Sequence, residues 1–170
     1  MLLAGKKGFE AGGDGAETSQ PNLIEFAYAV ERHLYPQARL DRMKTWAEAG
    51  VKLSALIDLS DGLGGDIQHL CKASGTGAVI EAGLLPIHMQ TFKAAELYEK
   101  DPLSMALFGG EDYELLCALP AGRVAAASKA LSGLGCGLAE IGRVGSGSGV
   151  GIRRDDGRLL AALGHDQLNR

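Results

Sequence analysis

Two aspartates separated by two residues are the first candidates for chemistry in this sequence. Asp58 and Asp61 stand in the segment IDLSDGLGGD, with Ser60 between them. Asp58 falls at the end of an apolar, buried-looking strand, where a carboxylate is costly unless it meets a cation or hydrogen-bond donors. A turn can bring both carboxylates to one side, where their oxygens suit Mg²⁺ while phosphate oxygens and water complete its shell. The spacing therefore predicts a metal site.

Three glycines that follow these aspartates favour a phosphate ligand. They are Gly62, Gly64 and Gly65. Because they lack side chains in the first helical turn, they let a phosphate approach backbone N–H groups whose dipole favours anions. Each glycine costs a helix about 1 kcal/mol, so three in one turn need a reason. The spacing alone leaves another interpretation open, in which Asp61 caps the helix and Asp58 pairs with a lysine or arginine.

A second acidic, glycine-rich segment reads LFGGEDYELL over residues 107–116. Two glycines are followed by the adjacent carboxylates Glu111 and Asp112 at the entry of a predicted strand. This loop is placed to face the first one across the ends of neighbouring strands. The alternative to a functional loop is a turn that is merely exposed to solvent. Tyr113 is expected to pack against neighbouring residues.

The elements that position these residues follow from hydrophobic periodicity. Helical spacing predicts a helix over 22–34 that Asn22 caps, and a second over 38–49 in which Trp46 shares a core stripe with Leu40, Met43 and Ala47. A strand, a tight turn and a helix are expected around Asp58 and Asp61. The remaining predictions are strands at 51–59, 77–80, 113–119 and 138–144, helices at 91–100 and 120–131, and a hairpin at 151–161 that turns at 155–157. This order predicts an α/β sandwich around one sheet.

Composition excludes several classes of protein. The 170 residues carry a net charge of −4 without a basic stripe, which argues against nucleic-acid binding. No apolar run reaches the length of a membrane span, and the N-terminus does not resemble a secretory signal, so no membrane association is expected. Three cysteines without CxxC spacing predict buried free thiols and a cytoplasmic protein.

Other motif types are absent or incomplete. The four histidines lack metal-ligand spacing, and there is no GxxxxGK[ST] sequence. Residues 145–150 miss the third glycine of GxGxxG, which argues against dinucleotide binding. The low-complexity segment 145–151 is interpreted as a flexible connection.

At its two acidic motifs the sequence resembles the thiamine-monophosphate kinase family, which belongs to a superfamily with aminoimidazole ribonucleotide synthetase. Residues 58–63, DLSDGL, resemble the family's D-[VIL]-S-D-G-L, and residues 109–115, GGEDYEL, match its G-G-E-D-Y-E-L. Residues 33–39 are similar to a looser segment ahead of the first motif, and residues 164–168 to a C-terminal one. The resemblance implies an α+β fold, a layered α/β sandwich with a mixed sheet. It also implies that residues 22–170 form the family's C-terminal domain, whereas 1–21 hold the end of a missing N-terminal domain and a linker.

The resemblance assigns roles to individual residues. Asp58 and Asp61 would be catalytic and bind Mg²⁺, while Ser60 and Gly62 would bind the co-substrate ATP. The substrate residues, for thiamine monophosphate, would be Glu111, Asp112 and Leu168. Leu168 stands where the family has an aromatic residue, and the letters GGD at 12–14 are interpreted as a coincidence.

The implied reaction transfers the ATP γ-phosphoryl group to thiamine monophosphate and gives thiamine diphosphate. The full-length form would be a homodimer, and this chain alone would be inactive. Two alternatives stay open: another ATP-dependent activity of the same superfamily, and a standalone binding or assembly module without turnover.

Overall fold

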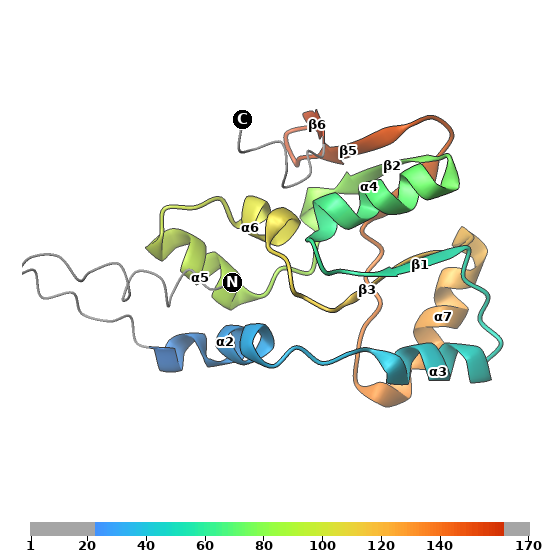
Figure 1. Cartoon of the computed structure of the whole chain (residues 1–170), viewed down its shortest axis with the longest axis horizontal. Coiled ribbons are helices and arrows are strands. Elements are labelled where there is room, and N and C mark those ends of the chain that lie inside the picture. Colours follow the sequence, from blue (N-terminus) through green and yellow to red (C-terminus); the bar gives the residue numbers. More distant parts are fainter. Residues whose placement is uncertain (1–22, 162–170) are drawn as a thin grey trace, which may run out of the picture.

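A computed structural model describes residues 23–161 of the chain (Figure 1). Helices and strands alternate along most of this length, as the periodicity predicts. In chain order the elements are η1 (Leu23–Phe26), α2 (Ala27–Leu34), α3 (Leu40–Glu48), β1 (Ala55–Asp58), α4 (Leu63–Ser74), β2 (Gly77–Glu81), η2 (Ala82–Leu84), α5 (Met89–Leu97), α6 (Pro102–Phe108), β3 (Leu115–Ala118), η3 (Ala121–Arg123), α7 (Val124–Leu131), η4 (Ser132–Leu134), β4 (Gly142–Gly145), β5 (Gly149–Arg153) and β6 (Leu159–Ala161).

The strands in the described part of the chain form two sheets, so the expectation of a single sheet is wrong. β1 and β3 form an antiparallel ribbon, and β4, β2, β5 and β6 form a second sheet in that order. The second sheet is mixed, as predicted, because β2 runs parallel to β5 and antiparallel to β4. Helix α4 packs against β1 as well as against β2 and β5, which places it in contact with both sheets (Figure 1).

The β1–β3 ribbon separates two hydrophobic cores. Alternate residues of a strand point to opposite faces. Ile57 and Leu116 therefore pack into a core with α4, α6 and the four-stranded sheet, whereas Leu56 and Leu115 pack into a core with α3 and α7. A ribbon with apolar residues on both faces is held from both sides, which fixes the position of its ends.

The helix predicted at 38–49 is confirmed as α3, but its core stripe is narrower than expected. Trp46 is buried, and its indole N–H donates to the carbonyl of Ala127 on α7 at 3.0 Å. Leu40 is 70% exposed and Met43 43% exposed, and Ala47 is also exposed. The stripe prediction is wrong for these three residues, because only the side of α3 that carries Trp46 packs into the core with α7.

Several other elements differ from the predictions in their existence or their bounds. Helix α6 was not predicted; Asp101 caps it by accepting from the N–H of Leu103 at 3.1 Å, and Pro102 opens it. The segment 145–151 is not one flexible connection, because β5 already begins at Gly149. β1 and β3 are both shorter than the predicted strands.

The C-terminal hairpin is confirmed. β5 pairs antiparallel with β6, and the turn closes with a hydrogen bond from the N–H of Gly157 to the carbonyl of Arg154 at 2.8 Å. Cys71 is buried and Cys117 and Cys136 are partly buried, all three as free thiols. Among the described residues, no helix combines the length and the apolar character that crossing a membrane requires. Asn22, the N-terminal segment through residue 21 and Leu168 lie outside the described residues.

Candidate functional site

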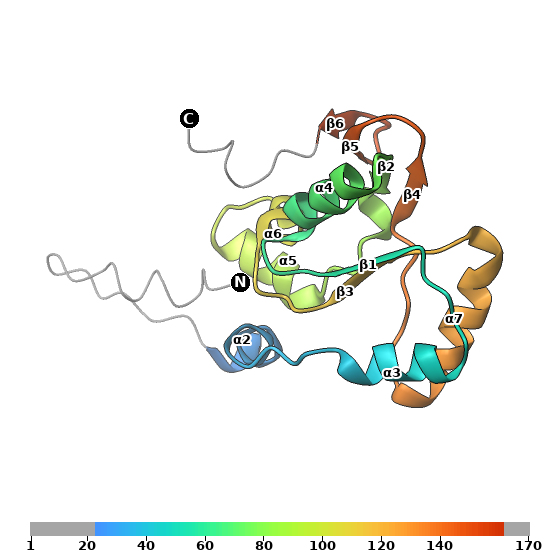
Figure 2. The same ribbon diagram turned by 45° about the vertical axis from the view of Figure 1, so that its right-hand side comes forward.

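The two acidic motifs lie side by side at one end of the β1–β3 ribbon, as the sequence predicts (Figure 2). Asp58 is paired with Leu115, and backbone hydrogen bonds continue beyond the strands. The N–H of Leu59 donates to Glu114 O, that of Tyr113 to Leu59 O and that of Glu111 to Ser60 O, each at 2.8 Å. The first loop is therefore joined to the second by main-chain contacts that depend on neither side-chain charge nor a ligand.

The two aspartates of the first loop are exposed to solvent. Asp58 is the last residue of β1 and its side chain is not buried, which corrects the expectation that burial forces a partner on it. Asp61 is exposed too, and neither carboxylate forms an ion pair within residues 23–161. Both can therefore offer oxygens to a divalent cation.

Asp61 does not cap the following helix, contrary to one interpretation of the sequence. Gly62 is the N-cap residue of α4, with φ 95°, and no side-chain hydrogen bond caps the helix. This φ lies in a region that L side chains rarely adopt, so glycine is required there. The Asp61 side chain is consequently left available for another role.

The glycines of the first loop have a packing role that the sequence did not reveal. A Cβ atom on Gly62 would lie 3.0 Å from the carbonyl oxygen of Leu107, and one on Gly64 would lie 2.9 Å from the Phe108 ring. Gly62 and Gly64 are buried against the end of α6. Gly65 has ordinary space around it, with Asp61 Cβ at 3.8 Å. Close approach of α6 explains Gly62 and Gly64, and a nucleotide contact by Gly62 stays a prediction.

Asp66 is a residue of this loop region to which the sequence analysis gave no role. It is 2% exposed, and its Oδ2 accepts from the N–H groups of Ser60 at 2.9 Å and Asp61 at 3.1 Å. An acidic residue in the first turn of a helix is a signal that could have drawn attention to it. The structure shows that this carboxylate is turned back onto the first loop.

The second loop has an unusual backbone. Glu111 has φ 67° and Tyr113 has φ 51°, both in the left-handed region that non-glycine residues avoid. Strain of this kind persists where surrounding contacts impose it, and it is common at functional sites. Tyr113 is 40% exposed, so the prediction that it is a packing residue is wrong. The loop thus presents Glu111, Asp112 and Tyr113 to solvent.

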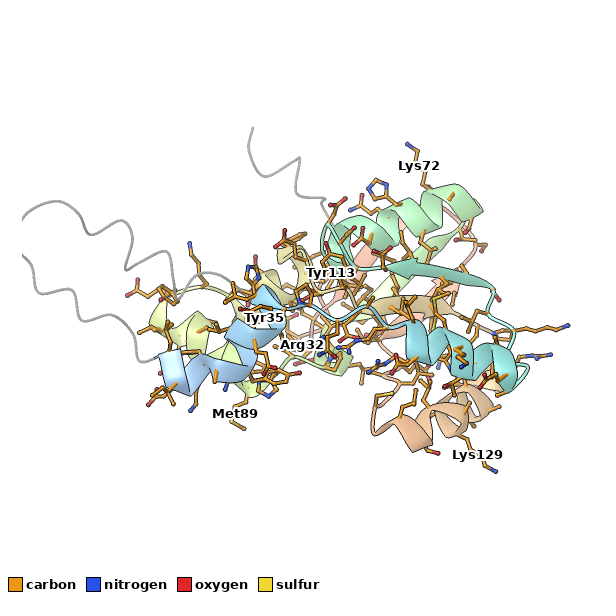
Figure 3. All side chains as sticks on the ribbon, turned by 60° about the horizontal axis from the view of Figure 1, so that its bottom comes forward. Arg32, Tyr35, Lys72, Met89, Tyr113 and Lys129 are labelled. Carbon is orange, nitrogen blue, oxygen red and sulfur yellow. The ribbon has the colours of Figure 1, made fainter. Side chains whose placement is uncertain are left out.

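Glu114 connects this loop to the N-terminal helices. Its carboxylate binds Arg32 of α2, and it accepts two hydrogen bonds from Arg39. Figure 3 shows Arg32 where α2 meets the rest of the molecule. The hydrogen bonds to Glu114 raise the already high pKa of Arg39. Arg32 lies just before the segment 33–39 and Arg39 ends it, and no local pattern indicates that they pair with Glu114.

Two titratable groups near the second loop have shifted pKa values. Burial lowers the pKa of His33, against the opposing influence of Glu111, whose carboxylate lies 3.9 Å from its Nε2. Asp112 is exposed, yet neighbouring atoms partly desolvate its carboxyl and raise its pKa. The Glu114 carboxylate adds to this rise, whereas Arg32 opposes it.

An open groove of about 1690 Å³ runs beside these residues. Its lining includes Arg32, His33, Arg39, Glu111, Asp112 and Glu114. Within the described residues no three His, Cys, Asp or Glu side chains gather closely enough to form a metal site by themselves. A cation at Asp58 and Asp61 stays a prediction, and it would need further ligands such as phosphate oxygens and water.

Comparison with known proteins defines the class first. The family model described as AIR synthase related protein, C-terminal domain, matches residues 3–155. The chain therefore belongs to this family of C-terminal domains. Hydrogenase maturation protein HypE shares the fold, with a TM-score of 0.64 at 19% identity over 76% of this chain and 41% of that one.

Within the class, the resemblance to thiamine-monophosphate kinase is confirmed. The kinase of Aquifex aeolicus is 37% identical over 135 residues, which are 79% of this chain and 40% of that protein. Its crystal structure matches 94% of this chain and 47% of its own with a TM-score of 0.67 and 32% identity. AaThiL complexed with AMPPCP and TMP matches equally well, over 93% of this chain and 45% of that one at 32% identity. This chain spans about two fifths of the curated relative's length.

Proposed function

We propose that this chain supplies the C-terminal part of an ATP-dependent thiamine-monophosphate kinase. The complete enzyme would transfer the γ-phosphoryl group of ATP to the phosphate of thiamine monophosphate. The observation that carries the proposal is the main-chain connection of the DLSDG and GGEDYE loops, which brings Asp58, Asp61 and Glu111 to one end of one ribbon. A related structure that holds an ATP analogue and TMP supports the substrate pair.

The residues of the first loop would hold the metal and the nucleotide. Asp58 and Asp61 are exposed carboxylates without an ion pair in the described chain, and hard oxygen ligands of this kind suit Mg²⁺. Bound Mg²⁺ would reduce the repulsion between the two anionic reactants. Ser60 and Gly62 would contact ATP from the same loop.

The second loop would bind the phosphate acceptor. Glu111 and Asp112 are presented to solvent by a strained backbone, and Glu111 would contact thiamine monophosphate with Asp112 in support. Leu168 would complete the substrate site. No covalent nucleophile is required, because the catalytic task is to align the groups and to neutralise charge.

The proposals on domain organisation, localisation and oligomeric state follow from the resemblance to the kinase family. Residues 22–170 would form the C-terminal domain, and residues 1–21 would connect it to the remainder of the enzyme. That enzyme would be a cytoplasmic homodimer.

A chimaera tests the proposal. Residues 22–170 of this chain replace the matching part of the Aquifex aeolicus kinase, and thiamine diphosphate is measured by chromatography with ATP, Mg²⁺ and thiamine monophosphate. We expect product from the chimaera, and we expect Asp58→Asn to remove most of it, by a factor of about 10² or more. Asp155→Asn, an exposed aspartate in the β5–β6 turn, serves as the matched control and should retain activity.

Two results would reject this assignment. One is a folded chimaera that forms no thiamine diphosphate. The other is near-normal turnover by Asp58→Asn with an unchanged Mg²⁺ dependence. If the isolated chain takes up the Mg-nucleotide in calorimetry while the folded chimaera stays inactive, a binding module is the better description.

A further inference from the structure

One buried acidic side chain has no part in the function proposed above. Asp66 lies in the first turn of α4 and is 2% exposed, and it is the charged residue that the described chain buries most completely. Burial of a carboxylate is costly unless donors meet it. The donors that meet Asp66 are backbone N–H groups of the first loop, those of Ser60 and Asp61.

The backbone of Ser60 is held on both sides. Its N–H donates to Asp66 Oδ2 at 2.9 Å, and its carbonyl accepts from the N–H of Glu111 at 2.8 Å. The next N–H, that of Asp61, also donates to Asp66 Oδ2, at 3.1 Å. Asp66 thus fixes the amide side of the loop, and the second motif fixes its carbonyl side.

We propose that Asp66 is a positioning residue whose carboxylate holds the Ser60 and Asp61 backbone and thereby directs the side chains of Asp58 and Asp61 at a divalent cation. This inference rests on the proposed metal role of those two aspartates. Hydrogen bonds to an ionised acceptor are about twice as strong as neutral ones. The carboxylate of Asp66 therefore suits a loop that must keep two exposed aspartates in place before a ligand arrives.

A simpler role for Asp66 would be to complement the positive end of α4. The contacts distinguish the two roles, because Asp66 accepts from residues that precede the helix and not from the N–H groups of the helix itself. Removing a favourable charge at a helix end lowers stability but leaves metal affinity unchanged. Loss of a positioning contact changes the metal affinity of ligands that Asp66 does not touch.

The test measures the metal site in the complete 170-residue chain. The chain is labelled with ¹⁵N and titrated with Mn²⁺ in the presence of AMPPCP, and paramagnetic broadening of the Ser60, Asp61 and Gly62 amide signals is followed. Asp66→Asn keeps one acceptor oxygen but no charge. We expect the Mn²⁺ concentration that gives half of the full broadening to be about ten-fold higher in this variant than in the wild type. The Mn²⁺ concentration for half of the broadening should be higher still in Asp66→Ala.

Ile67→Val is the matched control, because Ile67 is the next residue of α4 and is also buried, at 6% exposure, but packs into the core. It should lower thermal stability without changing the Mn²⁺ titration. Hydrogen exchange in the wild type keeps the inference testable if the Asp66 variants do not fold. The Ser60 and Asp61 amides should exchange slowly, and rapid exchange of both would overturn the inference.

The outcomes separate the inference from the function on which it rests. If the wild type and Asp66→Asn titrate alike, Asp66 does not position the site, while the proposed function stands. If Mn²⁺ leaves the loop signals of the wild type unbroadened although Ser60 and Asp61 exchange slowly, this chain does not hold the cation through Asp58 and Asp61, and the inference fails, while the chimaera assay still decides the proposed function.

Discussion

Arg39 binds Glu114 through two hydrogen bonds that join residues 75 positions apart in the sequence. Its Nε lies 3.0 Å from Oε2, and its Nη2 lies 2.5 Å from Oε1. Arg32 binds the same carboxylate from α2. Glu114 also accepts the Leu59 N–H through its backbone carbonyl. One residue of the second motif therefore connects the first motif and the N-terminal helices.

This relationship predicts that Glu114→Gln is destabilising. The variant removes the charge that two arginines share, and hydrogen bonds to charged groups contribute more than neutral ones. Because the Glu114 side chain is 43% exposed, solvent screening limits the loss of unfolding free energy to about 1–2 kcal/mol in urea denaturation. Glu140→Gln, which removes an exposed pair with Arg143, should cost less than about 0.5 kcal/mol. Equal effects of the two substitutions would contradict a structural role for Glu114.

The glycines of α4 predict opposite effects for neighbouring substitutions. Gly64→Ala places a Cβ against the Phe108 ring and 3.2 Å from the carbonyl of Leu107, so it should lower the unfolding free energy by about 1–3 kcal/mol. Gly65→Ala meets only ordinary contacts and improves helix propensity, so it should raise stability by up to about 1 kcal/mol. Thermal melts of both variants measure this difference. A stable Gly64→Ala protein would mean that α6 does not require the glycine.

The strained backbone at Glu111 predicts a gain of stability from glycine. Glu111→Gly relieves a φ of 67° and should raise the unfolding free energy by about 0.5–1 kcal/mol, after allowance for the greater freedom of the unfolded chain. Glu111→Ala keeps a Cβ at the same φ and serves as the control, with no such gain. In the chimaera, both variants should weaken thiamine monophosphate binding. Equal stability of the two variants would show that the strain is negligible.

The raised pKa of Asp112 predicts a stability effect that depends on pH. A carboxyl whose pKa is higher in the folded state than in the unfolded state costs stability when it is ionised, and the cost disappears as pH falls through both values. Asp112→Asn should therefore raise the unfolding free energy at pH 7 by up to about 1 kcal/mol, discounted for its exposure. The gain should vanish at about pH 3, below the ordinary aspartate pKa of 3.8. Urea denaturation at both pH values measures it.

Asp155→Asn is again the matched control for this effect, because Asp155 is also an exposed aspartate but lies in the β5–β6 turn. An equal gain in unfolding free energy from Asp112→Asn and Asp155→Asn would indicate a general effect of net charge. A gain for Asp112→Asn that persists at low pH would argue against desolvation of its carboxyl.

Local patterns in the sequence determined most of the elements and both loops. The periodicity of 22–34, which the structure divides into η1 and α2, acts within a few residues. The same holds for the strand and helix around Asp58 and Asp61 and for the Asp155-Asp156-Gly157 turn, so each can be predicted without tertiary information. The two acidic motifs were identified for the same reason, since each is one short continuous segment.

Only the tertiary structure decided how these parts meet. β1 pairs with β3 and places Asp58 opposite Leu115, whereas the other described strands form a separate sheet. The contact of Glu114 with Arg32 and Arg39 spans up to 82 residues. The burial of Asp66 and the close approach of α6 to Gly64 depend on packing between helices and loops. Such contacts join residues that are distant along the chain, and local propensity carries no information about which distant groups will be neighbours.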